Sequence, residues 1–300
     1  MRPTQHHGFL DLPGELQDPA RARVHVLPVP YEATVSYETG TRDGPDAILR
    51  ASHEVELYDA ELDSEPCLSW GVCTLPPMKA VWRTPDDMVA AVADGAEAIM
   101  RSGKFPLFLG GEHSISPALL RGVRRVVNEP LVVVQIDAHA DLRDSFRGTR
   151  YSHGCAMRRI LDENPGPTVQ IGIRSYSMEE AIFIRENIGR VNLWPMSRIH
   201  IEDPRDFHRQ LAAAVSGRKV YLTIDVDGLD PSVVPATGTP EPDGLGFRQA
   251  WEIIRTVTTK GNVIAVDCVE LAPRPGLHTS EFSIAKLLYM TIASIMGPRN

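Results

Sequence analysis

The sequence predicts an α/β fold in which a mostly parallel central sheet lies between two layers of helices. Short apolar runs, each typical of a strand buried on both faces, alternate along the chain with segments of helical periodicity. This alternation favours parallel strands joined by helical crossovers. Acidic and histidine side chains directly follow three of the apolar runs, and ligands bind at the carboxyl ends of the strands in such sheets.

The predicted elements can be placed along the chain from these patterns. Strands are expected at 24–29, 105–109, 131–136, 168–173, 190–194, 219–224 and 262–267. Helices are expected at 86–101, 115–127, 178–188, 204–216, 247–259 and 281–297. The first of these helices has the clearest start, because Thr84 can cap it, Pro85 fits its first turn and Asp86 lies near the positive end of its dipole.

A single domain is predicted over residues 24–300, after a polar tail at residues 1–23. The length of 300 residues suits one large α/β domain, and no repeat, low-complexity tract or long linker divides the chain. The tail contains prolines and no apolar centre, so we do not expect a secretory signal. No apolar run approaches the ~18 residues that a membrane span needs.

The composition argues against nucleic acids and membranes as partners. The net charge of −8 would repel both of these anionic surfaces, whereas it is compatible with a small cationic substrate. The four cysteines form neither a disulfide framework nor a zinc-binding spacing. Reduced thiols of this kind are typical of a cytoplasmic protein, which is the location we expect.

The segment from Asp137 to Asp141 carries the strongest functional signal. It directly follows the apolar run at 131–136, and alternate side chains of an extended backbone point the same way. Asp137, His139 and Asp141 are therefore expected to converge just past the strand. Burying like charges together costs several kcal/mol unless a cation compensates them. This pattern predicts ligands for a divalent metal ion.

The same arrangement follows two other predicted strands. Asp225 and Asp227 follow the run at 219–224, and His113 follows the run at 106–109. The predicted metal ligands are His113, Asp137, His139, Asp141, Asp225 and Asp227. Imidazole and carboxylate ligands together favour manganese or a similar first-row ion over thiolate-bound zinc. Four carboxylates are too many for one such ion, and they suit two ions that share bridging oxygens.

These motifs resemble those of the ureohydrolase superfamily of arginases and agmatinases, and most closely those of agmatinases. The matching segments are Gly110-Gly111-Glu112-His113-Ser114, Asp137-Ala138-His139-Ala140-Asp141, Ser152-His153-Gly154, Asp225-Val226-Asp227-Gly228-Leu229-Asp230-Pro231, Gly238-Thr239-Pro240-Glu241-Pro242 and Asp267-Cys268-Val269-Glu270-Leu271-Ala272-Pro273. The resemblance runs from about Val24 to Met296, and the upstream segment Thr34-Val35-Ser36-Tyr37 is also similar to agmatinase-like members. It implies the arginase-like fold, with the metal site at the carboxyl ends of the strands.

Two residues depart from the pattern of the superfamily. Glu112 stands where many members carry aspartate, and it is expected to lie behind the metal ligand that follows it. Asp243 replaces a glycine that is common in its loop. This second change is expected to alter the shape of the loop or the preference for a substrate.

The resemblance implies two manganese ions per subunit and a role for each motif residue. One ion would be held by His113, Asp137, Asp141 and Asp225, and the other by Asp137, His139, Asp225 and Asp227. Glu270 would bind the substrate, because a carboxylate can accept two parallel hydrogen bonds from a guanidinium group. Asp141 would accept a proton, and His153 would protonate the leaving amine. The resemblance also implies a homo-oligomer, either a trimer or a hexamer.

The reaction implied is the removal of urea from a small cationic guanidino compound. The loop at 142–151 lacks the usual arginase pattern, which favours agmatine as the substrate, with putrescine and urea as products in polyamine biosynthesis. N1-aminopropylagmatine and 4-guanidinobutanoate are alternatives. The second of these is considered because Arg143, Arg147 and Arg150 in that loop can bind a carboxylate.

Two other classes of function were weighed against this one. A phosphatase of the haloacid dehalogenase type would use Asp225 as its nucleophile, but it would leave His113 and His139 without a role. A non-catalytic relative that only regulates or assembles would be expected to have lost some ligands. All six predicted ligands and Glu270 are present in this sequence.

Overall fold

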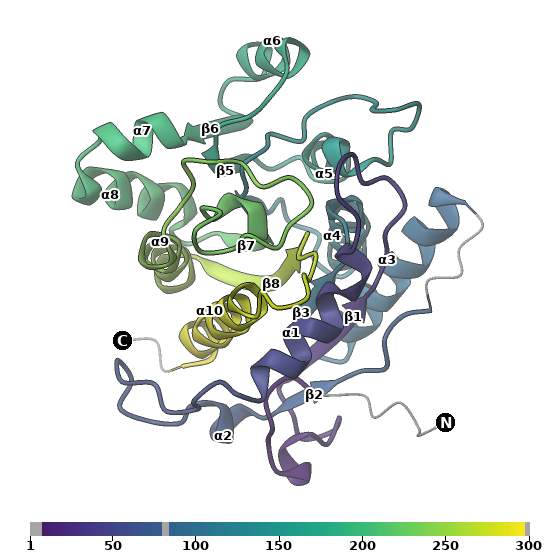
Figure 1. Cartoon of the computed structure of the whole chain (residues 1–300), viewed down its shortest axis with the longest axis vertical. Helices are drawn as coiled ribbons and strands as arrows, with labels where there is room; N and C mark the ends of the chain where they lie inside the picture. The colour runs from purple at the N-terminus through teal and green to yellow at the C-terminus, as the bar shows by residue number, and fades with distance from the viewer. Residues whose placement is uncertain (1–7, 80–83, 298–300) are drawn as a thin grey trace.

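Eight parallel strands form one sheet that lies between two layers of helices (Figure 1). The computed structural model describes residues 8–79 and 84–297. The strands run in the order β2-β1-β3-β8-β7-β4-β5-β6 across the sheet. Their bounds are β1 Val24–Val29, β2 Val72–Thr74, β3 Phe105–Gly110, β4 Val132–Ile136, β5 Thr168–Ile173, β6 Val191–Pro195, β7 Lys219–Asp225 and β8 Asn262–Val269.

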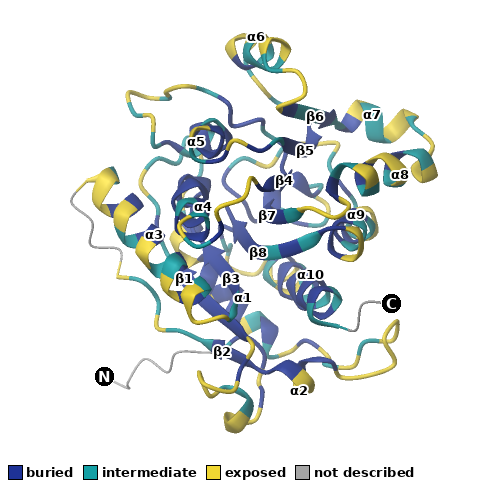
Figure 2. Ribbon diagram, turned by 180° about the vertical axis from the view of Figure 1, so that it is seen from behind, coloured by how far each residue is buried: buried dark blue, intermediate teal, exposed yellow. Residues whose placement is uncertain are grey.

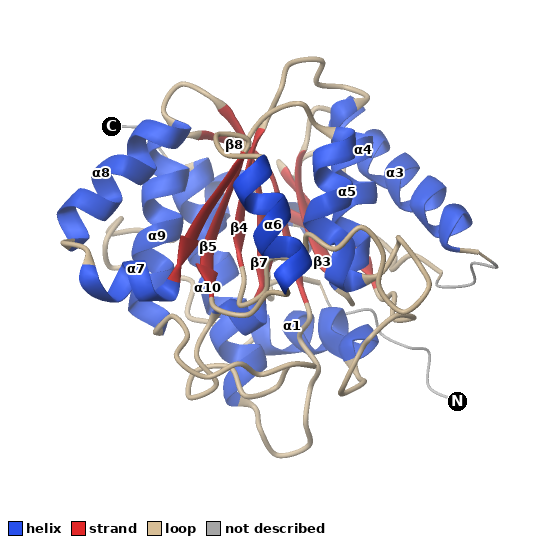
Figure 3. Cartoon of the chain, turned by 90° about the horizontal axis from the view of Figure 1, so that it is seen from above, coloured by secondary structure: helices blue, strands red, loops and turns tan. Residues whose placement is uncertain are grey.

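The helices cover both faces of the sheet, as Figure 3 shows from above. Their bounds are α1 Gly44–Ser52, α2 Cys67–Trp70, α3 Pro85–Arg101, α4 Ser116–Arg124, α5 Ala156–Glu163, α6 Met178–Glu186, α7 Met196–Ile201, α8 Pro204–Val215, α9 Phe247–Lys260 and α10 Thr279–Met296. On one face α1 packs on α10, α10 on α9 and α9 on α8, whereas α3, α4 and α5 pack together on the other. Within the described residues, none of these helices is long and apolar enough to cross a membrane.

The inner strands are almost entirely buried in the centre of the molecule, whereas β6 at one edge of the sheet is partly exposed (Figure 2). Every residue of β1, β4 and β5 is buried. Helices cover both faces of the sheet, so both sets of alternating side chains need apolar surroundings. This is why the strands appear in the sequence as continuous apolar runs rather than as alternating patterns.

The predicted fold class is confirmed, and every strand in the described sheet pairs in parallel. The expected start of α3 is also confirmed. The Thr84 side chain accepts a hydrogen bond from the Asp87 N–H, and the Asp87 side chain accepts one from the Thr84 N–H. The elements not predicted are β2, α1, α2, α5 and α7. Because β2, α2 and α7 have only three to six residues, they are too short to show a hydrophobic period. The helices α1 and α5 begin without a side-chain cap that would mark their start.

Residues from the predicted N-terminal tail pack against the body of the protein. Phe9, Leu10 and Leu12 are buried. The Phe9 N–H donates to Thr74 Oγ1 and the Leu10 N–H donates to Ser52 Oγ, each at 2.8 Å. This part of the segment therefore covers the β2 edge and the end of α1. The division into a tail at 1–23 and a domain at 24–300 stays a prediction.

Candidate metal centre

The six predicted metal ligands lie together at one edge of the sheet. His113 follows β3, Asp137 follows β4 and Asp225 ends β7. The strands β3, β8, β7 and β4 are consecutive in the sheet, so their carboxyl ends are neighbours. The structure therefore brings together side chains that are more than a hundred residues apart in the sequence.

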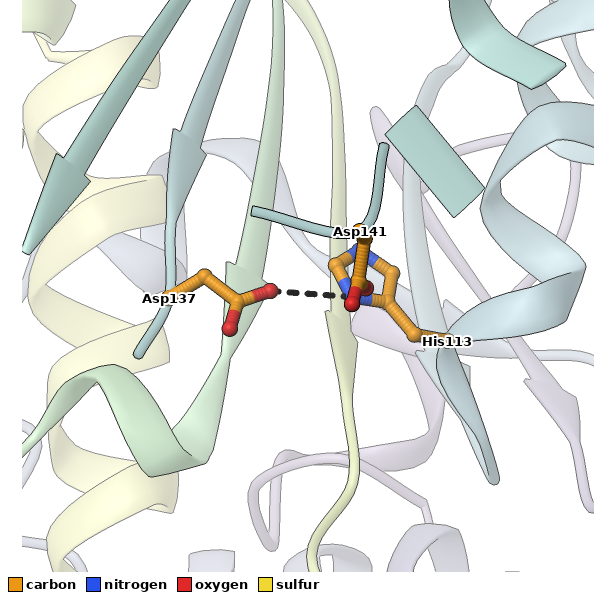
Figure 4. A group of neighbouring side chains, drawn as sticks. All are labelled: His113, Asp137 and Asp141. Carbon is orange, nitrogen blue, oxygen red and sulfur yellow. Dashed lines mark ion pairs between the residues drawn. The ribbon is translucent and has the colours of Figure 1, made fainter. Parts of the chain in front are cut away.

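The first group of ligands surrounds His113. Its Nδ1 lies 3.1 Å from Asp137 Oδ2, 3.0 Å from Asp141 Oδ2 and 3.2 Å from Asp225 Oδ2. Figure 4 shows the carboxylates of Asp137 and Asp141 beside the ring of His113. Although three carboxylates surround it, this buried Nδ1 has no hydrogen-bond partner among the described residues. A cation held between these four side chains would satisfy all of them.

The second group of ligands surrounds His139. Its Nδ1 lies 3.0 Å from Asp227 Oδ2 and 3.7 Å from Asp137 Oδ1. The two oxygens of Asp137 therefore face different histidines, which is the arrangement that a bridging carboxylate needs. Asp225 differs, because its Oδ2 lies near His113 whereas its Oδ1 accepts a hydrogen bond of 3.0 Å from the Asp227 N–H and faces no second histidine among the described residues. A bridging role for Asp225 stays a prediction.

The segment at 238–242 supports this second group. Thr239 Oγ1 donates a hydrogen bond of 3.3 Å to Asp227 Oδ2. Glu241 Oε1 lies 3.7 Å from His139 Nε2. The motif Gly-Thr-Pro-Glu-Pro thus holds one carboxylate and one imidazole of the predicted centre in place.

The electrostatics of the cluster favour the binding of cations. Burial, and then the charge of Asp137, raise the pKa of Asp141 to about 7. Burial, and then the charge of Asp227, raise the pKa of Asp225 well above its usual range. Both carboxyl groups are thus crowded by like charges in a site of low polarity. Divalent cations would relieve this repulsion, and a mixed set of imidazole and carboxylate ligands fits first-row ions.

A buried hydrogen-bond relay fixes the orientation of the His113 ring. His113 Nε2 lies 3.0 Å from Thr223 Oγ1, and Thr223 donates its own proton to Asp267 Oδ1 at 2.7 Å. Asp267 also accepts hydrogen bonds from Ser116 and Tyr221. Because Thr223 donates to Asp267, it must accept from His113, which places the imidazole proton on Nε2. Nδ1 is then available to a metal ion.

The relay predicts a measurable loss of metal affinity when its central hydroxyl is removed. In the variant Thr223→Val, the affinity for the divalent ion is expected to fall about 10–100-fold, because partners that orient a ligating histidine typically contribute that much. Competition with a chromogenic chelator measures the affinity. Thr291→Val is a matched control, since Thr291 is equally buried in α10 and bonds only to its own helix. A wild-type affinity of Thr223→Val for the divalent ion would show that the relay does not orient His113 for metal binding.

Glu270 directly follows β8 and lines a pocket of about 270 Å³ together with ligands of both groups. Its Oε1 accepts a hydrogen bond of 2.7 Å from the His113 N–H. Burial, and then the charge of Glu112, raise the pKa of Glu270 well above its ordinary value. Cations bound in the pocket would lower this pKa again, because a nearby positive charge favours the carboxylate form.

Three acidic residues near the pocket have left-handed backbones, which non-glycine residues rarely adopt. The φ angle is 53° at Asp141, 66° at Glu270 and 65° at Asp243. At Asp243 this explains why related loops favour glycine, and here the aspartate forms an ion pair of 2.9 Å with His200. At Asp141 and Glu270 the strain is typical of a functional site, where the surrounding structure imposes a geometry that the backbone alone disfavours.

His153 lies in the same pocket, after Ser152, and its ring is largely buried. Its backbone N–H donates a hydrogen bond of 3.0 Å to Thr34 Oγ1. Burial, and then the nearby positive charges of His139 and His113, lower the pKa of His153 to about 4. Divalent cations at those histidines would act in the same direction. The ring is therefore neutral at neutral pH.

Glu112 lies behind the ligand His113, as expected. It is buried and accepts hydrogen bonds of 2.6 Å from the backbone N–H groups of Ala33 and Thr34. Its other oxygen accepts from Thr34 Oγ1 at 2.7 Å and from Ser114 Oγ at 2.6 Å. The Thr34 hydroxyl thus links Glu112 to His153, because it also accepts a hydrogen bond from the His153 N–H. One buried carboxylate holds both a wall of the pocket and the histidine inside it.

Sequence reasoning assigned no role to several residues that form the outer wall of the pocket. They are Val35, Ser36, Tyr37, Glu38, Phe146, Ser175, Tyr176, Ser177 and Glu180. All but Glu180 lie outside helices and strands, where no periodicity marks them. The available signal was the resemblance of residues 34–37 to agmatinase-like proteins.

The chain was then compared with known proteins. A model of the arginase family matches residues 22–293. An N(1)-aminopropylagmatine ureohydrolase from Synechocystis is 42% identical over 274 residues, which cover 90% of this chain and 88% of the relative. An agmatinase from Pyrococcus horikoshii is 32% identical over 275 residues, which cover 89% of this chain and 90% of the relative.

A solved structure agrees with these relatives. The agmatine ureohydrolase of Thermoplasma volcanium superposes with a TM-score of 0.82 at 31% identity, covering 92% of this chain and 90% of that one. The family model spans most of the chain, and two relatives above 30% identity span most of their own lengths as well. The chain therefore belongs to the arginase family and is a ureohydrolase of the agmatinase type.

Proposed function

We propose that two manganese ions occupy the six-ligand centre and that the protein releases urea from N1-aminopropylagmatine in preference to agmatine. The observation that carries the reaction is the position of Glu270, a buried carboxylate in the same pocket as both ligand groups. The choice of the longer substrate rests on identity, which is 42% with the aminopropylagmatine relative and 32% with the agmatinase. The sequence motifs alone favoured agmatine.

Each pocket residue has a task in this reaction. Divalent cations, when bound, lower the pKa of water enough to supply a nucleophile at neutral pH. Glu270 accepts hydrogen bonds from the guanidinium group, and its plane is set by the bond from the His113 N–H. Asp141 accepts the proton that the attacking water loses. The bond between the guanidino carbon and the nitrogen of the alkyl chain then breaks, which yields urea and an amine.

His153 is proposed to carry the proton to the leaving amine. Its imidazole is neutral, so it first receives a proton inside the pocket and then donates it. In His153→Asn, kcat is expected to fall about 10²-fold, because general acid–base catalysis typically contributes 10²–10⁴-fold. Steady-state kinetics and metal content measure the effect. His208→Asn serves as the control, since His208 lies outside the pocket and bonds to Thr256. Unchanged kcat in His153→Asn would remove this role.

The three arginines of the loop at 142–151 do not favour a carboxylate substrate. Arg143 lies 3.7 Å from Glu180, Arg150 pairs with Asp162 at 3.2 Å, and Arg147 donates to the Ser36 carbonyl at 2.8 Å. Arg143 and Arg150 thus already have carboxylates of the protein beside them, and Arg147 has a backbone acceptor. This argues against 4-guanidinobutanoate. Membership of the arginase family also removes the phosphatase hypothesis, and the complete set of ligands argues against a non-catalytic relative.

The assembly and the location of the protein are proposed separately. We expect a homo-oligomer, either a trimer or a hexamer. In support of this, Met178, Ile182 and Ile188, on and just after α6, are 73%, 45% and 83% exposed. Light scattering of the purified protein measures the mass of the assembly and so tests for a trimer or a hexamer. The cysteines are buried free thiols, and the cytoplasmic location stays a prediction.

Urea release by the purified, manganese-loaded protein tests the proposed function. The panel contains N1-aminopropylagmatine, agmatine, 4-guanidinobutanoate and arginine at matched concentrations. The highest kcat/KM is expected for N1-aminopropylagmatine, with agmatine next. A higher kcat/KM for agmatine would restore the prediction made from the motifs. Absence of urea with all four compounds would contradict the proposal.

A further inference from the structure

The pocket has a buried floor and an open rim. At the floor, Asp141 and Glu270 are only 6% and 8% exposed. At the rim, Tyr37 and Tyr176 are 73% and 46% exposed, although both line the same pocket. A guanidinium group bound at the floor would therefore direct the rest of the substrate toward the two tyrosines.

Tyr37 stands on a segment that is fixed on both sides. The carbonyl of Ser36 accepts a hydrogen bond of 2.8 Å from Arg147, and the N–H of Glu38 donates to the Gly238 carbonyl at 3.3 Å. Within the described residues, the Tyr37 side chain has no hydrogen bond or ring contact of its own. The backbone from which this exposed aromatic ring projects is thus held in place, and no neighbouring side chain among the described residues occupies the ring.

Tyr176 lines the same pocket from another loop, whose backbone is also held on both sides. The Ser175 N–H donates to the Ala138 carbonyl at 3.0 Å, next to the predicted ligand His139. The Ser177 N–H donates to Glu180 Oε2 at 2.7 Å, where α6 begins. The ring of Tyr176 likewise has no partner in the described part of the chain. Two exposed aromatic rings therefore project into the rim from separate loops with fixed backbones.

The rim offers two open aromatic faces and one carboxylate to a cation. The third aromatic ring of the pocket, Phe146, is already covered by the guanidinium groups of Arg143 and Arg147, at 4.9 Å and 5.5 Å from its centroid. The rings of Tyr37 and Tyr176 are the lining aromatic faces left for a ligand. Between the floor and solvent, Glu38 adds a carboxylate that is half exposed and pairs with Arg274 at 3.2 Å.

We infer that Tyr37, Tyr176 and Glu38 form a subsite for the ammonium group at the far end of a guanidino polyamine. Aromatic faces and a nearby carboxylate attract an alkylammonium ion, and the loops that carry the two rings are already held by backbone hydrogen bonds. The inference rests on the proposed function and extends it. The aminopropyl extension reaches the rim, and contacts made there distinguish the long substrate from agmatine.

The variants Tyr37→Leu and Tyr176→Leu test the subsite, singly and together. Leucine keeps an apolar side chain and removes the π face. In the double variant, the ratio of kcat/KM for N1-aminopropylagmatine to kcat/KM for agmatine is expected to fall about tenfold, which is the range of two cation–π contacts. Tyr58→Leu is the control and should keep the wild-type ratio, because Tyr58 is half exposed, bonds to Asp63 and lies outside the pocket.

The possible outcomes separate the subsite from the proposed function. An unchanged ratio in the double variant, with a wild-type protein that prefers the long substrate, would overturn the subsite alone. Equal losses for both substrates would also overturn it, because that result indicates damage to the pocket. A wild-type protein that does not prefer the long substrate would contradict the proposed function before any variant is made. If Glu38→Gln at low salt also lowers the ratio of the two kcat/KM values, the attraction between the Glu38 carboxylate and the ammonium group is supported.

Discussion

Loss of bound metal together with turnover is expected when Asp137 becomes asparagine. Asp137 faces His113 with one oxygen and His139 with the other, so its charge serves both ligand groups. Removing one partner from a buried group of charges costs about 3–5 kcal/mol, which corresponds to roughly 10²–10³-fold weaker binding. Metal content after gel filtration and urea release together measure the effect. Asparagine keeps the shape of the side chain, so the fold should be retained.

The matched control for this experiment is Asp144→Asn. Asp144 lies on the same loop, but its side chain is 62% exposed and pairs with Arg159 rather than with a ligand. This variant should bind two ions per subunit and turn over normally. Two ions bound to Asp137→Asn with wild-type affinity would show that the six side chains do not form the centre proposed here.

The second large effect is expected at Glu270. In Glu270→Gln, kcat/KM is expected to fall on the order of 10²–10³-fold, because the guanidinium group loses a buried charged partner. Both ions should stay bound, since the glutamine oxygen can still accept the hydrogen bond from the His113 N–H. Metal content and steady-state kinetics on the same preparation separate the two effects.

A neutral substitution elsewhere controls for the loss of a carboxylate. Glu202→Gln removes an acid that pairs with Arg198 at 2.6 Å and does not line the pocket. It should leave both kinetics and metal content unchanged. Wild-type kcat/KM in Glu270→Gln would show that another group orients the substrate, and a loss of metal in that variant would make Glu270 a support of the centre instead.

The candidate ligands could be predicted because two local signals coincide at each of them. An apolar run identifies a buried strand. A polar residue directly after that run marks the carboxyl end of the strand, where ligands bind in a parallel sheet. Asp137 and Asp225 satisfy both conditions without any knowledge of the fold. Their common location follows once the strands are parallel, because all the carboxyl ends then face the same way.

The partners of these ligands could not be predicted in the same way. Thr223 lies inside β7 and Asp267 inside β8. Because apolar residues surround each of them in the sequence, no local pattern shows that the two form a buried polar pair. Their importance depends on which strands are adjacent, and the order β3-β8-β7-β4 is not encoded in any local pattern. Tyr37 and Tyr176 were missed for a different reason. They lie in loops, where only the folded structure shows which side chains meet.

The hydrogen bonds of Thr34 have a consequence for how this enzyme can be redesigned. Thr34 joins the outer wall of the pocket to His153, and Glu112 holds it from behind. In the proposed mechanism, the binding energy of a long substrate against this wall would therefore steady His153, and so lower the barrier rather than only tighten binding. Attempts to exchange the substrate preference by grafting residues 34–38 alone should then produce slow enzymes. A successful graft would need to carry the histidine loop with it.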